Sequence, residues 1–192
     1  MSDQIGEDED VKRLVEEIGR LRAHVAQLEQ RVEQLDQLAH QDSLIDLPNR
    51  RGFLRELERL IARAGRYDAK GAMLFIDVDG LKAINDSFGH GAGDEALIQV
   101  ADLLAGGIRK SDVCARIGGD EFGILLESAD EKSAHETASR LIDLIASCEL
   151  LHEGNELPLS VAIGVGLIEP NDTAETVMAR ADEEMYRRKA AA

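Results

Sequence analysis

The chain has 192 residues, of which 44% are apolar, and this suits one full-sized globular domain with a smaller appended segment. It has 38 acidic and 22 basic residues, a formal net charge of −16, which argues against general binding to nucleic acid or to anionic membranes. The apolar runs are too short to span a bilayer, and the two cysteines, Cys114 and Cys148, lack metal-ligand spacing. We therefore predict a soluble protein of a reducing compartment, the cytoplasm.

The N-terminal segment divides into two parts. Residues 1–10 are strongly acidic and are predicted to form a disordered tail. Residues 11–41 are predicted to form a coiled-coil dimerisation helix, because apolar side chains recur at alternating steps of three and four. These positions are Val11, Leu14, Ile18, Leu21, Val25, Leu28, Val32 and Leu35.

The residue types in this apolar seam favour two parallel helices, since every first heptad position is Val or Ile and every fourth is Leu. Flanking positions that would meet across the dimer carry opposite charges at Glu17 with Arg22, whereas His24 with Glu29 requires a protonated histidine. The alternative is an amphipathic helix folded back on its own domain, which would normally show a wider apolar stripe.

Residues 42–192 alternate between helical and strand periods, which predicts an α/β domain with helices packed on a mixed sheet. The predicted elements are, in order, the helix RRGFLRELERLIARA, the buried strand GAMLFIDVDG, the helix DEALIQVADLLAGGI, the hairpin DVCARIGGDEFGILLE, the helix EKSAHETASRLIDLIASC, the strand LPLSVAIGVGLI and the helix TAETVMARADEEMYRRK.

Four acidic residues stand at strand ends. Asp77 and Asp79 end the first strand, and Asp120 and Glu121 lie at the tip of the hairpin. If the two strands are neighbours, these carboxylates converge and repel one another unless a cation lies between them. Oxygen ligands of this kind suit Mg²⁺, which points to metal-assisted phosphoryl or nucleotidyl transfer. For any single acid a solvated strand end is the more common explanation, but not for the convergent set.

From about Asp42 to its end the chain resembles the diguanylate cyclase family with its GGDEF domain. The signature GGDEF is intact over residues 118–122, and it is accompanied in order by LPNRR, DVDGLKAINDSFGHGAGDEAL, RKSD and ADEEMYRRK. The resemblance implies a palm-like fold related to nucleotidyl cyclases. It also implies that two GTP molecules, each held by one domain of a homodimer, are joined into cyclic di-GMP with release of pyrophosphate.

The resemblance implies a site that binds two divalent ions, Mg²⁺ or Mn²⁺. The metal would be held by the side chains of Asp77 and Asp120 and by the main-chain carbonyl of Val78. Glu121 would lie beside the ribose 3′-hydroxyl, as a base or as a second metal ligand. Lys82 would complete the catalytic set with Asp120 and Glu121.

Substrate contacts are implied in the same way. Asn85 and Asp94 match the family's guanine-binding residues, although from the sequence alone Asn85 could belong to a turn and Asp94 could cap a helix. The remaining positions are backbone contacts at Gly118, Gly119, Gly80 and Leu81, and phosphate contacts at Lys82 and Lys189.

The segment RKSD fits the family's inhibitory RxxD site, with Arg109 and Asp112 binding the product and Arg140 supplying a second arginine. The chain departs from the family pattern at Ile45 and Asp46, where Thr-Gly is usual. It also lacks the usual Gly-Arg-Asn tail after Lys189, so that either phosphate binding is weaker or the sequence has been cut.

Two other functions remain open at this stage. One is a catalytically silent module that senses cyclic di-GMP through Arg109 and Asp112, although such modules normally lose a signature acid. The other is a plain dimerisation scaffold in which the coil alone acts, which the ordered set of motifs disfavours.

Overall fold

The computed structural model describes residues 2–67 and 69–190, except for the side chains of residues 2–12, 14, 15, 34, 37 and 38. The chain forms two compact units, Met1–Ala39 and His40–Ala192. Among the helices of the described residues, none combines the length and the apolar character needed to cross a membrane.

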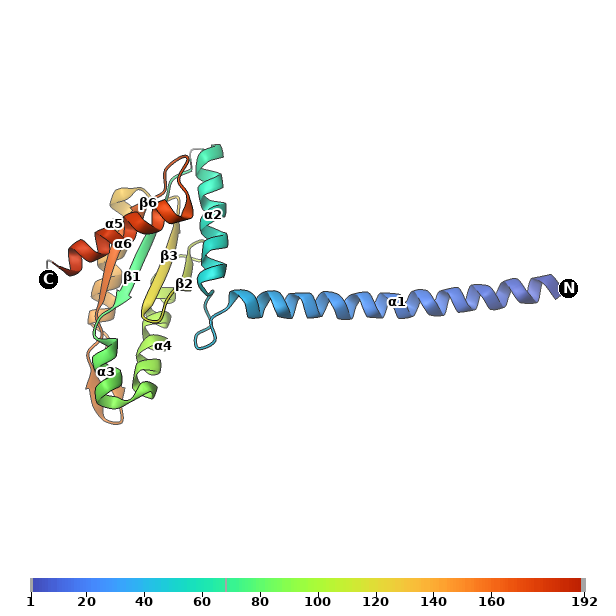
Figure 1. The fold of residues 1–192 in the computed structure, drawn as a ribbon, viewed down its shortest axis with the longest axis horizontal. Helices are drawn as coiled ribbons and strands as arrows, with labels where there is room; N and C mark the ends of the chain where they lie inside the picture. Colours follow the sequence, from blue (N-terminus) through green and yellow to red (C-terminus); the bar gives the residue numbers. More distant parts are fainter. Residues whose placement is uncertain (1, 68, 191–192) are drawn as a thin grey trace. The chain divides into compact units, whose positions relative to one another are not determined.

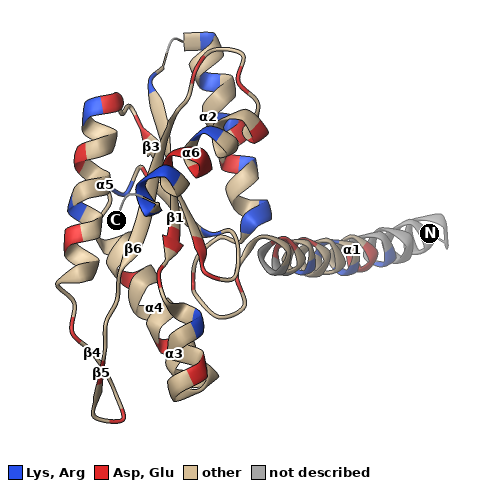
Figure 2. Cartoon of the chain, turned by 60° about the vertical axis from the view of Figure 1, so that its left-hand side comes forward, with Lys and Arg blue, Asp and Glu red and all other residues tan. Residues whose placement is uncertain are grey.

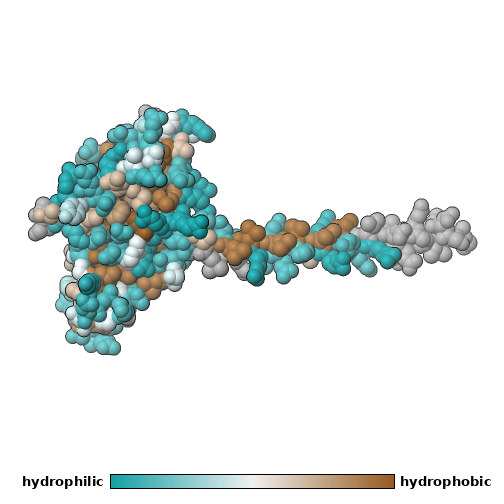
Figure 3. Space-filling view, in the orientation of Figure 1, coloured by the Kyte–Doolittle hydropathy of each residue, from teal (hydrophilic) through white to brown (hydrophobic). Residues whose placement is uncertain are grey.

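The first unit is the helix α1 (Ser2–His40). Its apolar seam lies open to solvent, with the side chains from Ile18 to Leu35 between 49% and 65% exposed, and Figure 3 shows these apolar residues gathered along α1. The side chains of Val11 and Leu14 lie outside the described residues.

In the structure the helix begins at Ser2. The disordered tail over residues 1–10 stays a prediction.

The second unit is an α/β domain whose main sheet has the strand order β2-β3-β1-β6 (Figure 1). Its elements are α2 (Arg50–Tyr67), β1 (Gly71–Val78), α3 (Leu81–Phe88), α4 (His90–Gly106), β2 (Val113–Arg116), β3 (Glu121–Glu127), α5 (Glu131–Ala146), β4 (Leu150–His152), β5 (Asn155–Leu157), β6 (Val161–Leu167) and α6 (Ala174–Lys189). The α/β class, the hairpin of β2 and β3, and helices at all the predicted places are confirmed.

All strand pairs of this sheet are antiparallel, so its strands are not mixed in direction as the sequence predicted. The crossovers do join parallel strands, β1 to β2 and β3 to β6, but in each case another strand lies between the two. This interleaving is the split βαβ arrangement of ferredoxin-like folds. It places the tip of the β2–β3 hairpin beside the end of β1.

The sheet is covered by helices on both faces. Leu74 and Ile76 of β1 belong to a core that includes residues of α3, α4 and α5, whereas the alternate residues Met73 and Phe75 belong to a core with α2 and α6. Ile45, where the family usually has threonine, is buried in the first of these cores. Because both faces are buried, β1 reads as a continuous apolar run.

Helix α6 lies very close to β6 because β6 contains glycine. A Cβ atom at Gly164 would lie 2.1 Å from the carbonyl oxygen of Ala181 and 2.2 Å from the nitrogen of Met185. The Glu184 carboxylate also accepts a 3.0 Å hydrogen bond from the Val165 N–H on this edge strand. These contacts fix the helix that ends in Lys189.

Two local features were not predicted. The short hairpin of β4 and β5 has only three residues in each strand, too few for a periodic pattern. Residues 81–88 form α3, which Gly80 precedes in a left-handed conformation (φ 69°), and Gly89 (φ 86°) separates α3 from α4. Glycine tolerates positive φ at no steric cost, so these two residues allow two helices where a single later one was predicted.

We predict that Gly164→Ala lowers the free energy of unfolding by about 1–3 kcal/mol, because the added methyl group forces α6 away from the sheet. Gly65→Ala is the matched control, since no atom lies within 4 Å of a Cβ placed there on α2. The control should be neutral or stabilising by up to about 1 kcal/mol. Urea unfolding curves measure both, and equal midpoints would contradict close packing at Gly164.

Candidate active site

The strand-end acids converge as the sequence predicted. Asp77 pairs in register with Glu121 across β1 and β3, and the Val78 N–H donates a 2.9 Å hydrogen bond to the carbonyl of Asp120. The acidic end of β1 is red in Figure 2. The first strand and the signature hairpin are therefore direct neighbours at their acidic ends.

A lysine lies between two of these acids. The ammonium of Lys189 contacts Asp77 Oδ1 and lies 3.3 Å from Asp79 Oδ1. The hydrogen bond to Asp77 is the largest cause of a raised Lys189 pKa, and Asp79 also accepts a 3.0 Å hydrogen bond from the Ser160 hydroxyl. The sequence predicted a metal ion among these carboxylates and a phosphate contact for Lys189, and in this structure the Lys189 ammonium lies against two of the acids.

Glu121 has a raised pKa. Burial is the main cause, followed by the neighbouring charge of Asp120 and, more weakly, those of Asp77 and Asp182, while Arg50 acts in the opposite direction. A further negative charge is thus disfavoured beside Glu121, and a positive charge is favoured.

The two signature glycines have different surroundings. A Cβ at Gly118 would lie 2.1 Å from Glu121 Oε2, whereas nothing lies within 4 Å of one at Gly119. Glycine at residue 118 thus makes room for the Glu121 carboxylate itself, which the sequence did not indicate. Gly119 faces open space, as a nucleotide contact would require.

Arg116 holds the signature turn. Its Nε and Nη2 donate to the Gly119 carbonyl at 3.3 and 2.7 Å, and its Nη1 donates to Asp42 Oδ1 at 3.2 Å. Pro48 accepts a 2.9 Å hydrogen bond from the Arg116 N–H, and Arg50 donates to the carbonyl of Ile117 at 3.4 Å. These arginines stand in the segments RIGGDEF and LPNRR, yet sequence reasoning assigned neither of them to the site.

The chemistry of the site fits a divalent cation. Asp77 and Asp120 offer hard oxygen ligands on adjacent segments, and the raised pKa of Glu121 reflects its burial first and the neighbouring negative charge of Asp120 second. Within the described ranges, no group of three or more His, Cys, Asp or Glu side chains has a metal-binding arrangement. Lys189 at Asp77 keeps one of the candidate ligands engaged.

The predicted guanine-binding residues lie on neighbouring helices. Asn85 belongs to α3 and Asp94 to α4, and the carboxamide of Asn85 lies against Gly93, the residue before Asp94. The alternatives of a turn at Asn85 and a helix cap at Asp94 are therefore wrong, because both residues are inside helices.

The predicted phosphate-binding backbone is the start of α3. Gly80 is its N-cap and Leu81 its first residue, followed by the exposed Lys82. The N–H groups at a helix start are suited to an anion. Leu81 is itself buried in the core, so only its backbone is available for such a contact.

The predicted inhibitory residues line one hollow of about 290 Å³, which Arg109, Asp112 and Arg140 share with residues of β3 and α5. The Asp112 carboxylate accepts hydrogen bonds from the N–H groups of Arg109 (3.0 Å) and Glu127 (3.2 Å). Arg140 donates to the Gly107 carbonyl at 2.7 Å. Three residues chosen from a short motif and a separate helix thus meet.

Comparison with known proteins identifies the family. Residues 39–192 match the family described as diguanylate cyclase, GGDEF domain. The match covers most of the chain, and the chain therefore belongs to the diguanylate cyclase GGDEF-domain family.

Relatives with curated names are much longer. The chain is 39% identical over 152 residues to the probable diguanylate cyclase DgcE of Escherichia coli, covering 79% of this chain and 14% of DgcE. It is 40% identical over 150 residues to the diguanylate cyclase TpbB of Pseudomonas aeruginosa, covering 77% of this chain and 34% of TpbB. The chain thus spans at most about a third of either protein.

Solved structures agree on the fold. The coiled coil and GGDEF domain of DgcB from Caulobacter crescentus, in complex with c-di-GMP, gives a TM-score of 0.86 at 26% identity, covering 93% of this chain and 95% of that one. The GGDEF domain of YfiN or TpbB from Pseudomonas aeruginosa gives 0.72 at 38% identity, covering 76% and 92%.

We predict that Glu121→Gln raises the free energy of unfolding at pH 7, measured in EDTA. The folded state raises the pKa of Glu121 above its ordinary value of 4.5. The stability gained from protonation of Glu121 in the folded state is therefore fully present below pH 4.5, and it is lost as the pH rises through the folded-state pKa. Glutamine resembles the protonated form, so the variant's advantage should disappear below pH 4.5. An advantage that persists at low pH would contradict this explanation.

Proposed function

We propose that this chain is a diguanylate cyclase that condenses two GTP molecules into cyclic di-GMP and pyrophosphate across a homodimer. The observation that carries the proposal is the register pair of Asp77 and Glu121, with Asp120 beside Val78, at the tip of an intact signature. A reaction of GTP, together with two free cysteines, suits the cytoplasm.

In this proposal Asp77, Asp120 and the carbonyl of Val78 hold Mg²⁺ or Mn²⁺, and Glu121 is the candidate ligand of a second ion. When bound, the metal would stabilise charge on the α-phosphate and lower the cost of deprotonating the attacking hydroxyl. The crowded carboxylates support this assignment.

Glu121 would act on the ribose 3′-hydroxyl. Its raised pKa supports the role of base over that of a permanently ionised ligand, because a base works best when its pKa is nearer to the working pH. Arg50 is nearby and limits the rise, so that the carboxylate keeps a charged form able to accept the proton.

The substrate would lie along the start of α3. Its triphosphate would meet the backbone N–H groups of Gly80 and Leu81 and the ammonium groups of Lys82 and Lys189. The position of Lys189 beside Asp77 supports this, because a phosphate held at the same acidic edge comes within its reach. Gly119 leaves room for the backbone to approach the nucleotide.

Product inhibition is proposed at the hollow of Arg109, Asp112 and Arg140. An arginine fork suits a phosphate or the Hoogsteen edge of guanine, and a carboxylate suits the opposite edge. The hydrogen bonds of Asp112 to two backbone N–H groups hold the hollow in shape.

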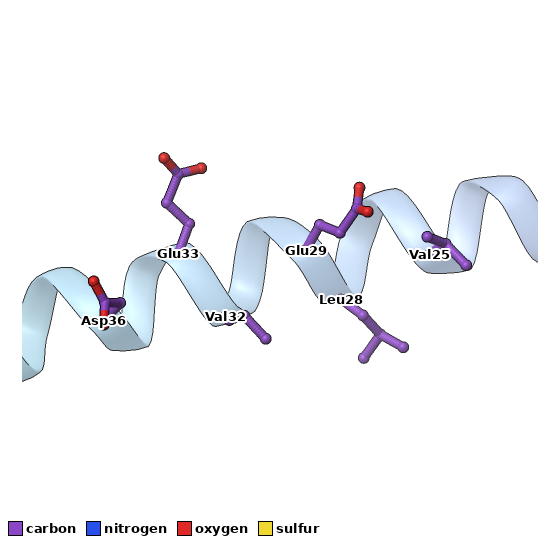
Figure 4. A pocket seen from close by; sticks show the side chains of 6 residues that line it. All are labelled: Val25, Leu28, Glu29, Val32, Glu33 and Asp36. Carbon is purple, nitrogen blue, oxygen red and sulfur yellow. The ribbon is translucent and has the colours of Figure 1, made fainter.

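The homodimer is proposed to form through the apolar seam of α1 in a parallel coiled coil. Figure 4 shows Leu28 and Val32 pointing to one side of the helix and Glu29 and Glu33 to the other. A second copy would cover the exposed seam. The link would also raise the effective concentration of one half-site for the other, as a reaction between two bound substrates requires. A shift of coil register that switches domain pairing belongs to the same proposal.

We predict that Leu28→Glu, which places a charge in the seam, makes the protein monomeric in sedimentation equilibrium. Turnover should then fall and rise steeply with protein concentration. Glu33→Gln on the other side of the helix is the control and should remain dimeric and active. A dimeric Leu28→Glu protein with unchanged turnover would contradict the role of the coil.

We predict that the protein incubated with GTP and Mg²⁺ forms cyclic di-GMP, followed by chromatography, and that Asp120→Ala or EDTA abolishes the product. The loss reflects a missing metal ligand. The Asp120→Ala protein should therefore have the same unfolding curve as the parent protein and bind cyclic di-GMP equally well.

The competing functions give different results. No turnover, with tight cyclic di-GMP binding that Arg109→Ala removes, would establish a receptor in place of an enzyme. An intact dimer with neither turnover nor nucleotide binding would support the function of a plain dimerisation scaffold.

A further inference from the structure

Gly93 is a buried glycine inside α4, four residues into the helix. A Cβ atom there would lie 2.2 Å from Asn85 Oδ1, 2.9 Å from its Cγ and 3.1 Å from its Nδ2. All three distances are to the carboxamide, so the whole polar end of Asn85 lies against the bare backbone of Gly93.

Glycine at this place has a cost. In a helix interior it is less favourable than alanine by about 1 kcal/mol. The three atoms nearest to the added Cβ all belong to Asn85, so its carboxamide is the first group that a side chain at residue 93 would displace. We attribute the glycine to the space that the Asn85 carboxamide occupies.

The carboxamide has its hydrogen-bonding capacity available. It is half-buried and makes no hydrogen bond to any described residue, while the main-chain carbonyl of Asn85 accepts a 2.9 Å bond from Gly89 and fixes the end of α3. Asp94, next to Gly93 in the chain, is exposed. The half-buried amide of Asn85 and the exposed carboxylate of Asp94 together offer both donors and acceptors to a ligand.

We propose that Gly93 is a positioning residue, which seats the carboxamide of Asn85 near Asp94 so that the two side chains bind guanine together. This rests on the proposed use of GTP and adds a residue that does not itself touch the base. With a methyl group at residue 93 the carboxamide must rotate away, and the paired arrangement is lost although both binding residues remain.

The experiment compares Gly93→Ala with Gly91→Ala, a matched control in the same helix where nothing lies within 4 Å of an added Cβ. Binding is measured by calorimetry with Mg²⁺ and 3′-deoxy-GTP, which cannot be cyclised, and turnover is measured with GTP. We expect Gly93→Ala to weaken binding about tenfold, the worth of one hydrogen bond of about 1.4 kcal/mol. KM should rise and kcat should change little, while Gly91→Ala matches the parent protein.

A second comparison separates seating from a general structural effect. In an Asn85→Ala background the added methyl group meets no carboxamide, so Gly93→Ala should cause no further loss of binding. If Gly93→Ala alone folds poorly, the proposal can still be tested, because the double variant is compared with Asn85→Ala and not with the parent protein.

The outcomes are distinct. If the parent protein binds 3′-deoxy-GTP and Gly93→Ala binds it equally well, or if the loss persists in the Asn85→Ala background, the role of Gly93 is overturned. If the parent protein binds no guanine nucleotide, the proposed function fails first and the assignment of Gly93 fails with it.

Discussion

The structure depends on a concentration of negative charge where its two central strands, β1 and β3, have neighbouring ends. Asp77, Asp79, Asp120 and Glu121 lie at the ends of two adjacent strands, in a chain that is already strongly acidic. Like charges at this spacing raise the free energy of the folded state unless a cation is nearby. The contact of Lys189 with Asp77 places a positive charge among these acids, and the charge of Asp120 adds to the effect of burial in raising the pKa of Glu121.

The surrounding elements hold the acidic ends of β1 and β3 in place. Glycines in β6 let α6 approach closely, so that its last residue reaches the acids of β1. Arg116 fixes the signature turn through its hydrogen bond to the Gly119 carbonyl. Interleaved crossovers make β1 and β3 neighbours although more than 40 residues separate them in the chain. A site of this kind needs precise backbone placement more than it needs many ligands.

Much of this could be predicted from the sequence. The buried run of β1, the hairpin around GGDEF and the amphipathic helices have strong periodicity, and the ordered motifs indicated the family and the acids. Antiparallel pairing throughout could not be predicted, because crossover helices show that two strands are parallel but not whether another strand lies between them. Helix α3 was missed because its start depends on a positive φ at Gly80, a local backbone property with no periodic signature.

The contacts of the site were less predictable than its members. Nothing in the spacing indicated that Lys189 would pair with Asp77, since 112 residues separate them. The steric reasons for Gly118 and Gly93 lie in the side chains of Glu121 and Asn85, and neither can be inferred before the backbone is known. Sequence patterns indicate the residues of the site more readily than the glycines that leave space for their side chains.

The double hydrogen bonding of Arg116 joins two parts of the α/β unit that are far apart in the chain. Asp42 lies two residues after the end of α1, and one guanidinium joins it to the carbonyl of Gly119 in the signature turn. All three residues belong to the unit His40–Ala192. The connection between the first residues of this unit and its signature turn is therefore internal to the unit.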